Sequence, residues 1–145
     1  MTTQYLFVYG TLKKEFNNKT SRYLVKNSEY IGKATYQGKL YMVDYYPGAI
    51  RSSNPGDIVY GELFKLKNPD IVLSALDEYE ECSDKFLDPK LFLRIKDNVK
   101  TAKGEYITSW IYLYNLPVKE LRQIETGNFT IYDITADKNI ILPFS

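Results

Sequence analysis

The sequence predicts an α+β domain, in which a small mixed β-barrel or strongly curled sheet has one main helix packed at its opening. Three observations predict this fold class. Several segments have the apolar and alternating patterns of strands, whereas a single segment combines helical periodicity with a clear start signal. No repeat, linker or low-complexity stretch divides the chain, so we expect a single domain over residues 1–145.

The first expected element lies within residues 5–12, which read Y-L-F-V-Y-G-T-L. The unbroken apolar and aromatic run predicts a strand buried on both faces, ending at Gly10. Gly10 can adopt a positive φ and lets another molecule approach the main chain closely. The amides of Gly10, Thr11 and Leu12 would then form a pocket for a carboxylate or an oxyanion. The alternative is a strand that simply turns into a polar loop.

The middle of the chain reads as strands separated by turns. Residues 20–26 predict a short helix with Thr20 as its cap. The expected strands are residues 29–42, 49–51, 58–66, 91–96 and 106–114.

Glycine and proline mark the connections between these segments. Gly38 indicates a bulge or bend in the longest strand. Turn signals occur at 45–48 and 54–57, and Gly104 lies in the loop of the last hairpin. The remaining expected elements are a short helix over 117–124 and an apolar run at 140–142.

The main helix is expected from Pro69 to about Glu80, with Asn68 as its cap and Pro69 at the first helical position. At about 100° per residue, one face of this helix meets the sheet. The apolar members of that face are Val72, Leu73, Leu76 and Tyr79.

Glu80 falls on the same face as these apolar residues. Glu78 and Glu81 fall on the opposite side, and Asp77 lies between. A carboxylate on a core-facing side costs free energy unless it is hydrogen-bonded or its pKa is raised by desolvation. Glu80 is therefore a candidate functional residue. The alternative is that the last turn frays and Glu80 caps an amide or pairs with Arg94.

Composition narrows the chemistry. There is no histidine, which excludes a histidine base or a histidine-ligated metal, and a lone cysteine lacks its usual activating partner. Carboxylates remain as the acid–base groups. The single cysteine, a start without secretory features and the lack of a membrane-length apolar run predict a cytoplasmic protein that contacts no membrane. A net charge of +1 offers no general attraction to nucleic acid.

Several short motifs occur in an order that resembles the gamma-glutamylcyclotransferase-like superfamily. They are Tyr9-Gly10-Thr11-Leu12, Tyr46-Pro47, Gly61-Glu62-Leu63-Phe64, Leu76-Asp77-Glu78-Tyr79-Glu80 and Phe92-Leu93-Arg94. Each is weak alone, but the ordered set covers most of the chain. The run Glu80-Glu81-Cys82 is similar to the γ-glutamylamine cyclotransferase branch. Phe92 and Glu81 depart from the common pattern, so the resemblance leaves the leaving-group preference open.

The resemblance implies an enzyme that releases 5-oxoproline from a γ-glutamyl compound without a metal or other cofactor. It implies that Glu80 is the general acid and base. The implied substrate-binding residues are Tyr9, Gly10, Thr11, Leu12, Tyr46 and Arg94. The expected partner is a small γ-glutamyl substrate, and the expected state is a monomer or a homodimer.

Two other functions remain open at this point. One is a catalytically silent module that binds a small ligand in the same fold. The other is an aromatic-rich β-domain that stacks single-stranded nucleic acid on its 14 tyrosines, although the near-neutral charge disfavours it.

Overall fold

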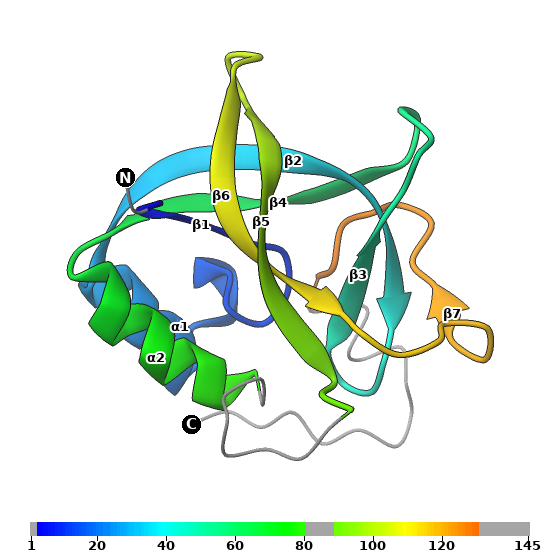
Figure 1. The fold of residues 1–145 in the computed structure, drawn as a ribbon, viewed down its shortest axis with the longest axis horizontal. Helices are drawn as coiled ribbons and strands as arrows, with labels where there is room; N and C mark the ends of the chain where they lie inside the picture. Colours follow the sequence, from blue (N-terminus) through cyan, green and yellow to red (C-terminus); the bar gives the residue numbers. More distant parts are fainter. Residues whose placement is uncertain (1–2, 81–88, 131–145) are drawn as a thin grey trace.

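A five-stranded mixed barrel forms the body of the protein in a computed structural model, which describes residues 3–80 and 89–130 (Figure 1). The strands are β1 (Tyr5–Val8), β2 (Ser28–Met42), β3 (Pro47–Arg51), β4 (Ile58–Leu66), β5 (Phe92–Thr101), β6 (Tyr106–Tyr114) and β7 (Arg122–Gln123). The helices are the short 3-10 helix η1 (Lys14–Phe16), α1 (Lys19–Lys26) and α2 (Pro69–Tyr79).

The barrel closes because the long strand β2 pairs at both ends of the strand order. β2 pairs with β4, and the order continues through β1 and β6 to β5, which returns to β2. The β1–β6 pair is parallel and the other pairs are antiparallel. The remaining strands, β3 and β7, both pair with the end of β2. The expected mixed barrel with a helix at its opening is thus confirmed.

Strand β1 separates two apolar layers, because its successive side chains point to opposite faces. Phe7 belongs to the cluster that fills the barrel, together with residues such as Leu63 and Ile111. Leu6 and Val8 belong to the second cluster, which lies between the barrel and the helices. Leu6, Phe7 and Val8 are all buried, as the sequence predicted, whereas Tyr5 at the start of β1 is partly exposed.

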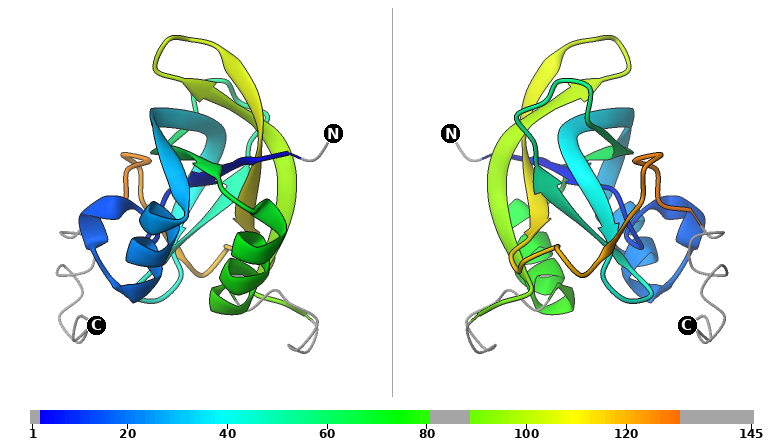
Figure 2. Two further views of the ribbon diagram at one scale, coloured as in Figure 1. Left: turned by 90° about the vertical axis from the view of Figure 1, so that its left-hand side faces the viewer. Right: turned by 90° about the vertical axis from the view of Figure 1, so that its right-hand side faces the viewer.

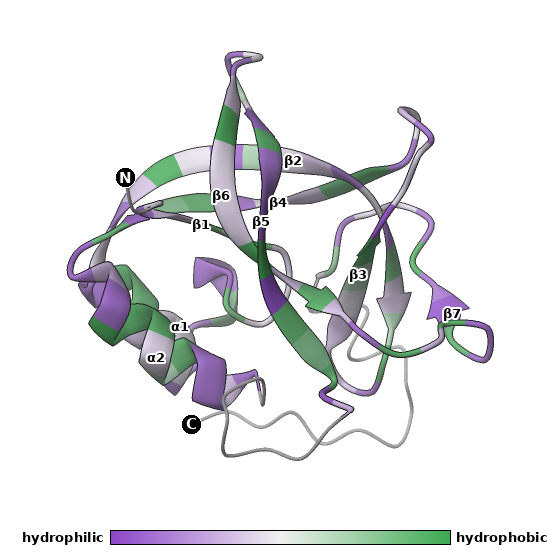
Figure 3. Cartoon of the chain, in the orientation of Figure 1, coloured by the Kyte–Doolittle hydropathy of each residue, from purple (hydrophilic) through white to green (hydrophobic). Residues whose placement is uncertain are grey.

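The two helices lie side by side against one end of the barrel (Figures 1 and 2). Val72, Leu73 and Leu76 of α2 are buried in the second apolar cluster, as expected. In Figure 3 the final turn of α2 is coloured as hydrophilic, which marks the end of the apolar face. Neither α1 nor α2, within the described ranges, is long and apolar enough to cross a membrane.

Both helix starts differ in detail from the sequence expectation. Asn18, not Thr20, caps α1, and its side chain accepts from the Ser21 amide while Ser21 accepts from the Asn18 amide. Asn68 precedes α2 as expected but adopts a left-handed conformation with φ 50° and makes no side-chain cap. Its carbonyl instead accepts from the amides of Ile71 and Val72.

Two further expectations are corrected. The irregularity in β2 lies at Gly32, where the register against β4 shifts and φ is 145°, rather than at Gly38. Gly38 is required for close packing, because a Cβ there would collide with the Ile50 carbonyl oxygen. Residues 117–124 form no helix.

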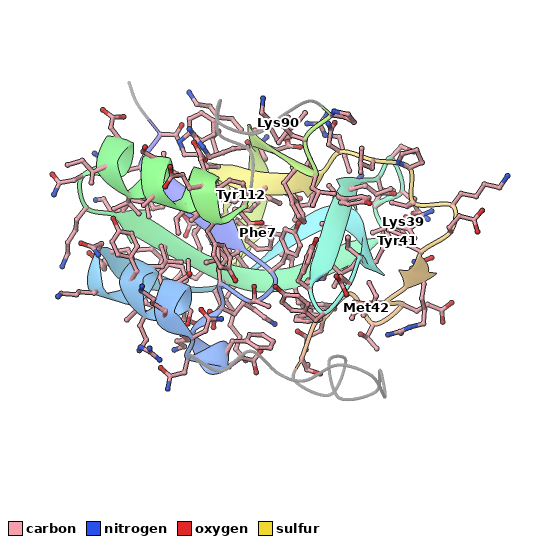
Figure 4. The ribbon with its side chains drawn as sticks, turned by 90° about the horizontal axis from the view of Figure 1, so that it is seen from below. Phe7, Lys39, Tyr41, Met42, Lys90 and Tyr112 are labelled. Carbon is pink, nitrogen blue, oxygen red and sulfur yellow. The ribbon has the colours of Figure 1, made fainter. Side chains whose placement is uncertain are left out.

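The segment after β6 instead provides the two-residue strand β7. It pairs with Tyr41 and Met42 at the end of β2, which Figure 4 labels. The expected strands over 49–51 and 58–66, the turn at 54–57 and the hairpin around Gly104 are confirmed. The expected apolar run at 140–142 lies outside the described residues.

Candidate functional site

A cavity of about 400 Å³ opens at the C-terminal end of α2. It is bounded by the end of β1 and the loop that follows, by the turn before β3, by the last turn of α2, and by side chains of β5 and β6. The lining residues are Phe7, Val8, Tyr9, Gly10, Thr11, Leu12, Tyr45, Tyr46, Pro47, Glu78, Tyr79, Glu80, Phe92 and Tyr112.

Six of the seven residues singled out in the sequence therefore line one cavity. They are Tyr9, Gly10, Thr11, Leu12, Tyr46 and Glu80. Arg94 is not among the lining residues. Its guanidinium instead donates to the Asp77 carboxylate, from Nε to Oδ1 at 2.7 Å and from Nη2 to Oδ2 at 3.0 Å.

Tyr9 fixes the end of β1 in the barrel. Its hydroxyl donates to the Tyr112 carbonyl oxygen at 2.6 Å and accepts from the Ala49 amide at 3.1 Å. Burial raises the pKa of the Tyr9 phenol well above its usual range, and the negative charge of Glu80 raises it further. Tyr9 thus stays neutral and holds the following loop in place.

The loop after Tyr9 lines the cavity and carries main-chain donors. The Lys13 amide donates to the Gly10 carbonyl at 3.0 Å and closes a turn. Within residues 3–80 and 89–130, no protein acceptor receives the amide protons of Gly10, Thr11 or Leu12. These N–H groups are suited to binding a carboxylate or a developing oxyanion.

Gly10 has a different role from the one its position suggested. Its φ is not positive, so the loop does not need glycine for its backbone conformation. A Cβ at Gly10 would lie 2.9 Å from Cγ of Pro47 and 3.0 Å from Cδ. Glycine is therefore required because the ring of Pro47 packs directly on the main chain.

The last turn of α2 carries the acidic side of the cavity. Glu80 follows the final helical residue, is partly buried, and donates its amide to the Leu76 carbonyl at 2.9 Å. Burial raises the pKa of Tyr79, and the Glu80 carboxylate raises it further, while the hydrogen bond to Thr11 lowers it. The charge of Glu80 thus acts on phenols on both sides of the cavity, Tyr79 and Tyr9.

Glu78 and Tyr79 depart from the helical-wheel expectation. Glu78 lines the cavity as well as being exposed, and Tyr79 is 41% exposed. The cavity surrounds the end of α2, so residues on different sides of the last turn reach it. The Tyr79 and Thr11 hydroxyls lie within hydrogen-bonding distance. Glu81 and Cys82 lie outside the described residues.

A partly buried polar network supports this end of the helix. Besides the two bonds from Arg94, the Tyr112 hydroxyl donates to Asp77 Oδ1 at 2.7 Å. The Arg94 guanidinium also lies 4.3 Å from the Trp110 ring centroid. Figure 4 labels Tyr112 beside the end of α2. The sequence marked Asp77 only as an intermediate position on the helix, so this network was missed.

Lys13 is a second residue that sequence reasoning missed. Its side chain is 5% exposed, and its ammonium donates to the Phe129 carbonyl and to Asn128 Oδ1 and pairs with Glu15 at 3.1 Å. The loop beside the cavity is thereby tied to residues more than 100 positions later in the chain. No local pattern indicates such a contact.

The arrangement as a whole combines main-chain donors, neutral phenols and carboxylates around one small cavity. Such a site can bind an anionic group on the donors and move a proton through a carboxylate. No cluster of three or more potential metal-ligating side chains occurs within the described ranges.

Comparison with known proteins gives consistent matches. The family model described as gamma-glutamyl cyclotransferase, AIG2-like, matches residues 6–131. Gamma-glutamylaminecyclotransferase A of Danio rerio is 29% identical over 138 residues, covering 91% of this chain and 81% of that protein. A gamma-L-glutamyl-butirosin B gamma-glutamyl cyclotransferase of Niallia circulans is 33% identical over 113 residues, covering 76% of this chain and 66% of that protein.

Solved structures share the fold. A crystal structure of an AIG2-like protein from Mus musculus superimposes with a TM-score of 0.68 and 18% identity, covering 90% of each chain. At this identity the likeness concerns the fold alone.

Proposed function

The chain belongs to the AIG2-like gamma-glutamyl cyclotransferase family, and we propose that it releases 5-oxoproline and a free amine from a γ-glutamyl amine. The observation that carries the proposal is the shared cavity. It brings the Gly10–Leu12 amides and Glu80, from two separate segments, to one space of about 400 Å³. That volume is in the range of small-molecule sites.

The proposed reaction is an intramolecular transfer. The α-amine of the γ-glutamyl group attacks its own γ-carbonyl carbon, a C–N bond forms to close the five-membered ring, and the bond to the leaving nitrogen breaks. Because the nucleophile is tethered to the electrophile, the protein supplies orientation and proton transfer rather than a covalent group. No water is consumed.

We assign the proton transfer to the Glu80 carboxylate. The substrate α-amine is mostly ammonium at neutral pH and must lose a proton before it attacks. The Glu80 carboxylate takes a proton from this nitrogen and delivers one to the leaving nitrogen, so the same group acts in both steps. Two other carboxylates near the cavity are held by protein donors: Asp77 accepts from Arg94 and Tyr112, and the buried Glu62 accepts from the Lys14 amide at 2.9 Å. Glu78 lines the cavity as well, and Glu80 is chosen over it because Glu80 is the less exposed of the two.

We assign the loop amides the role of binding the negatively charged groups of the substrate. The Gly10, Thr11 and Leu12 N–H groups bind either the substrate α-carboxylate or the oxygen that becomes negative as the ring closes. A donor aimed at such an oxyanion contributes on the order of 3 kcal/mol to transition-state stabilisation. Tyr46 and Pro47 also line the cavity, and we assign them the role of holding the glutamyl chain in a folded shape.

The lining charges favour an amine leaving group without a carboxylate. Glu78 and Glu80 line the cavity, and the described lining residues include no lysine or arginine. At an effective dielectric constant near 20, two like charges 6 Å apart cost roughly 3 kcal/mol. A leaving group that carries a carboxylate would meet this repulsion, whereas a neutral or cationic amine would not.

A panel of γ-glutamyl alkylamines, γ-glutamyl dipeptides and glutathione, assayed for 5-oxoproline, tests the proposal. We expect release of 5-oxoproline together with an equimolar amine from at least the alkylamines. Ligand binding without 5-oxoproline from any member would contradict the proposal and favour a silent binding module.

A further inference from the structure

Tyr112 is bonded to both halves of the candidate site. Its hydroxyl donates to Asp77 on α2 at 2.7 Å, and its main-chain carbonyl accepts from the Tyr9 hydroxyl at 2.6 Å. Asp77 lies three residues before Glu80, and Tyr9 directly precedes the Gly10–Leu12 amides. A single residue of β6 thus contacts the segment that carries the carboxylate and the segment that carries the anion-binding donors.

We propose that Tyr112 is a positioning residue that sets the Glu80 carboxylate relative to the Gly10–Leu12 amides. The inference rests on the proposed function, because it assigns a role toward the group that moves the proton. It extends that function by identifying what fixes the geometry between two segments that lie some 70 positions apart in the sequence.

The apolar part of the contact between α2 and the barrel gives little rotational control, whereas the hydrogen bonds at Asp77 and between Tyr79 and Thr11 are directional. The buried α2 side chains Val72, Leu73 and Leu76 pack in an apolar cluster, and apolar contact has no preferred direction. Hydrogen bonds to a carboxylate do have one. Since Glu80 lies at the end of the helix, a small rotation of α2 would displace its carboxylate within the cavity.

The strand register explains why two side chains donate to the same carboxylate. Arg94 on β5 and Tyr112 on β6 are directly opposite residues, so both reach the same Asp77 carboxylate from neighbouring strands. Tyr112 is 3% exposed and the Asp77 side chain 17% exposed, so their hydrogen bond is partly shielded from bulk water. This partly buried bond favours one orientation of Asp77, because separation would break the bond from the Tyr112 hydroxyl while Arg94 still donates to the carboxylate.

Tyr112→Phe is the direct test, because it removes the hydroxyl while keeping the ring, and because the carbonyl bond to Tyr9 is unaffected. We expect kcat per folded molecule to fall about tenfold with KM within threefold, since misplacement by about 1 Å can cost up to 100-fold. Tyr114→Phe is the matched control. Tyr114 lies two residues along β6, packs on Phe92 and does not line the cavity, so its variant should keep kcat within twofold.

The Glu80→Gln background separates positioning from general structural damage. If Tyr112 acts through the Glu80 carboxylate, Tyr112→Phe should lower the residual kcat of Glu80→Gln by less than twofold. An equal tenfold loss in both backgrounds, or no loss in the wild-type background, would overturn the role of Tyr112. Full activity of Glu80→Gln alone would overturn the assignment of Glu80 as the group that moves the proton, and no release of 5-oxoproline by the wild-type protein would overturn the proposed function, so these failures are distinguishable from a failure of the Tyr112 role.

Asp77→Asn provides a second route if Tyr112→Phe folds poorly. It removes the charge at the other end of the same bond with little change in size. We expect the same dependence on the background: a loss of kcat in the wild type and less than a twofold further loss in Glu80→Gln. A loss of the same size in both backgrounds would contradict the proposal.

Discussion

The hydroxyls of Thr11 and Tyr79 lie 2.9 Å apart, so the last helical residue of α2 is hydrogen-bonded to the loop that follows β1. Either hydroxyl can be the donor. Both residues line the cavity, and their contact bridges its two sides. The bond is exposed, so it contributes more to the arrangement of the cavity than to the stability of the fold.

Removing this bond should weaken the site with little loss of stability. For Tyr79→Phe we expect kcat/KM to fall several-fold and the free energy of unfolding to fall by about 1 kcal/mol or less, because one net hydrogen bond is lost. Steady-state kinetics and urea unfolding measure the two quantities. Tyr106→Phe, at a tyrosine that is 70% exposed in the β5–β6 hairpin, is the control. Unchanged kinetics in Tyr79→Phe would show that the bridge does not matter for turnover.

The contact between Gly10 and Pro47 gives a second prediction. A Cβ at position 10 would lie 2.9 Å from the Pro47 ring, which is too close, so the loop or the turn before β3 must move by a few tenths of an ångström. Gly10→Ala should therefore lower kcat/KM about tenfold while the protein still folds. The matched control is Gly56→Ala, in an exposed turn remote from the cavity, with no Cβ contact under 3.3 Å. Equal activity of the two variants would contradict this assignment.

The barrel has a pH-dependent contact outside the cavity. The Tyr36 hydroxyl donates to Asp97 Oδ2 at 2.7 Å, and burial together with this bond raises the pKa of Tyr36 to about 12. The unfolded chain loses this proton near pH 10, so the stability from the neutral phenol is complete below pH 10 and is lost between about pH 10 and 12. Tyr36→Phe should make the decline of the unfolding free energy over this range shallower.

Urea unfolding at pH 8 and pH 11.5 measures that difference. The unfolding free energy of the Tyr36→Phe variant should still fall somewhat as the pH rises, because burial also raises the pKa of Tyr9. An identical decline in the wild type and in Tyr36→Phe would show that Tyr36 does not contribute.

Leaving-group preference is a fourth prediction. Because Glu78 and Glu80 line the cavity, we expect a higher kcat/KM for a γ-glutamyl alkylamine than for the γ-glutamyl amino acid of matching size. Glu78→Gln should narrow this preference by reducing the repulsion of the carboxylate. The sequence placed Glu78 on the outer face of the helix, where its replacement would be neutral. A preference for the amino acid would reject the γ-glutamylamine assignment and leave a cyclotransferase of another specificity.

The elements that the sequence predicted well are those whose pattern is local. The apolar run of β1 and the periodic face of α2 need no knowledge of their partners, and both lie as expected. The ordered motifs also brought Gly10 and Glu80 to notice, and both line the cavity.

The features that were missed depend on contacts between distant segments. The Lys13 ammonium is buried because residues 128 and 129 return over it, which no pattern around position 13 can show. A helical wheel assigns Asp77 a direction but cannot show that Arg94 and Tyr112 are opposite each other on two strands. The family motif implied Arg94 as a substrate-binding residue, and in the structure its guanidinium donates to Asp77. Likewise, Gly32 rather than Gly38 carries the register shift, which depends on the pairing with β4.

Release of 5-oxoproline by Glu80→Gln, compared with the wild-type protein on the same γ-glutamyl alkylamine, tests the account most directly. Glutamine keeps the shape and hydrogen-bonding capacity of the side chain but cannot carry the proton, so kcat should fall about 10²- to 10⁴-fold while the ligand still binds and the protein unfolds at a similar urea concentration. Turnover of the Glu80→Gln variant within a few-fold of the wild type would contradict the assignment of Glu80 as the group that moves the proton.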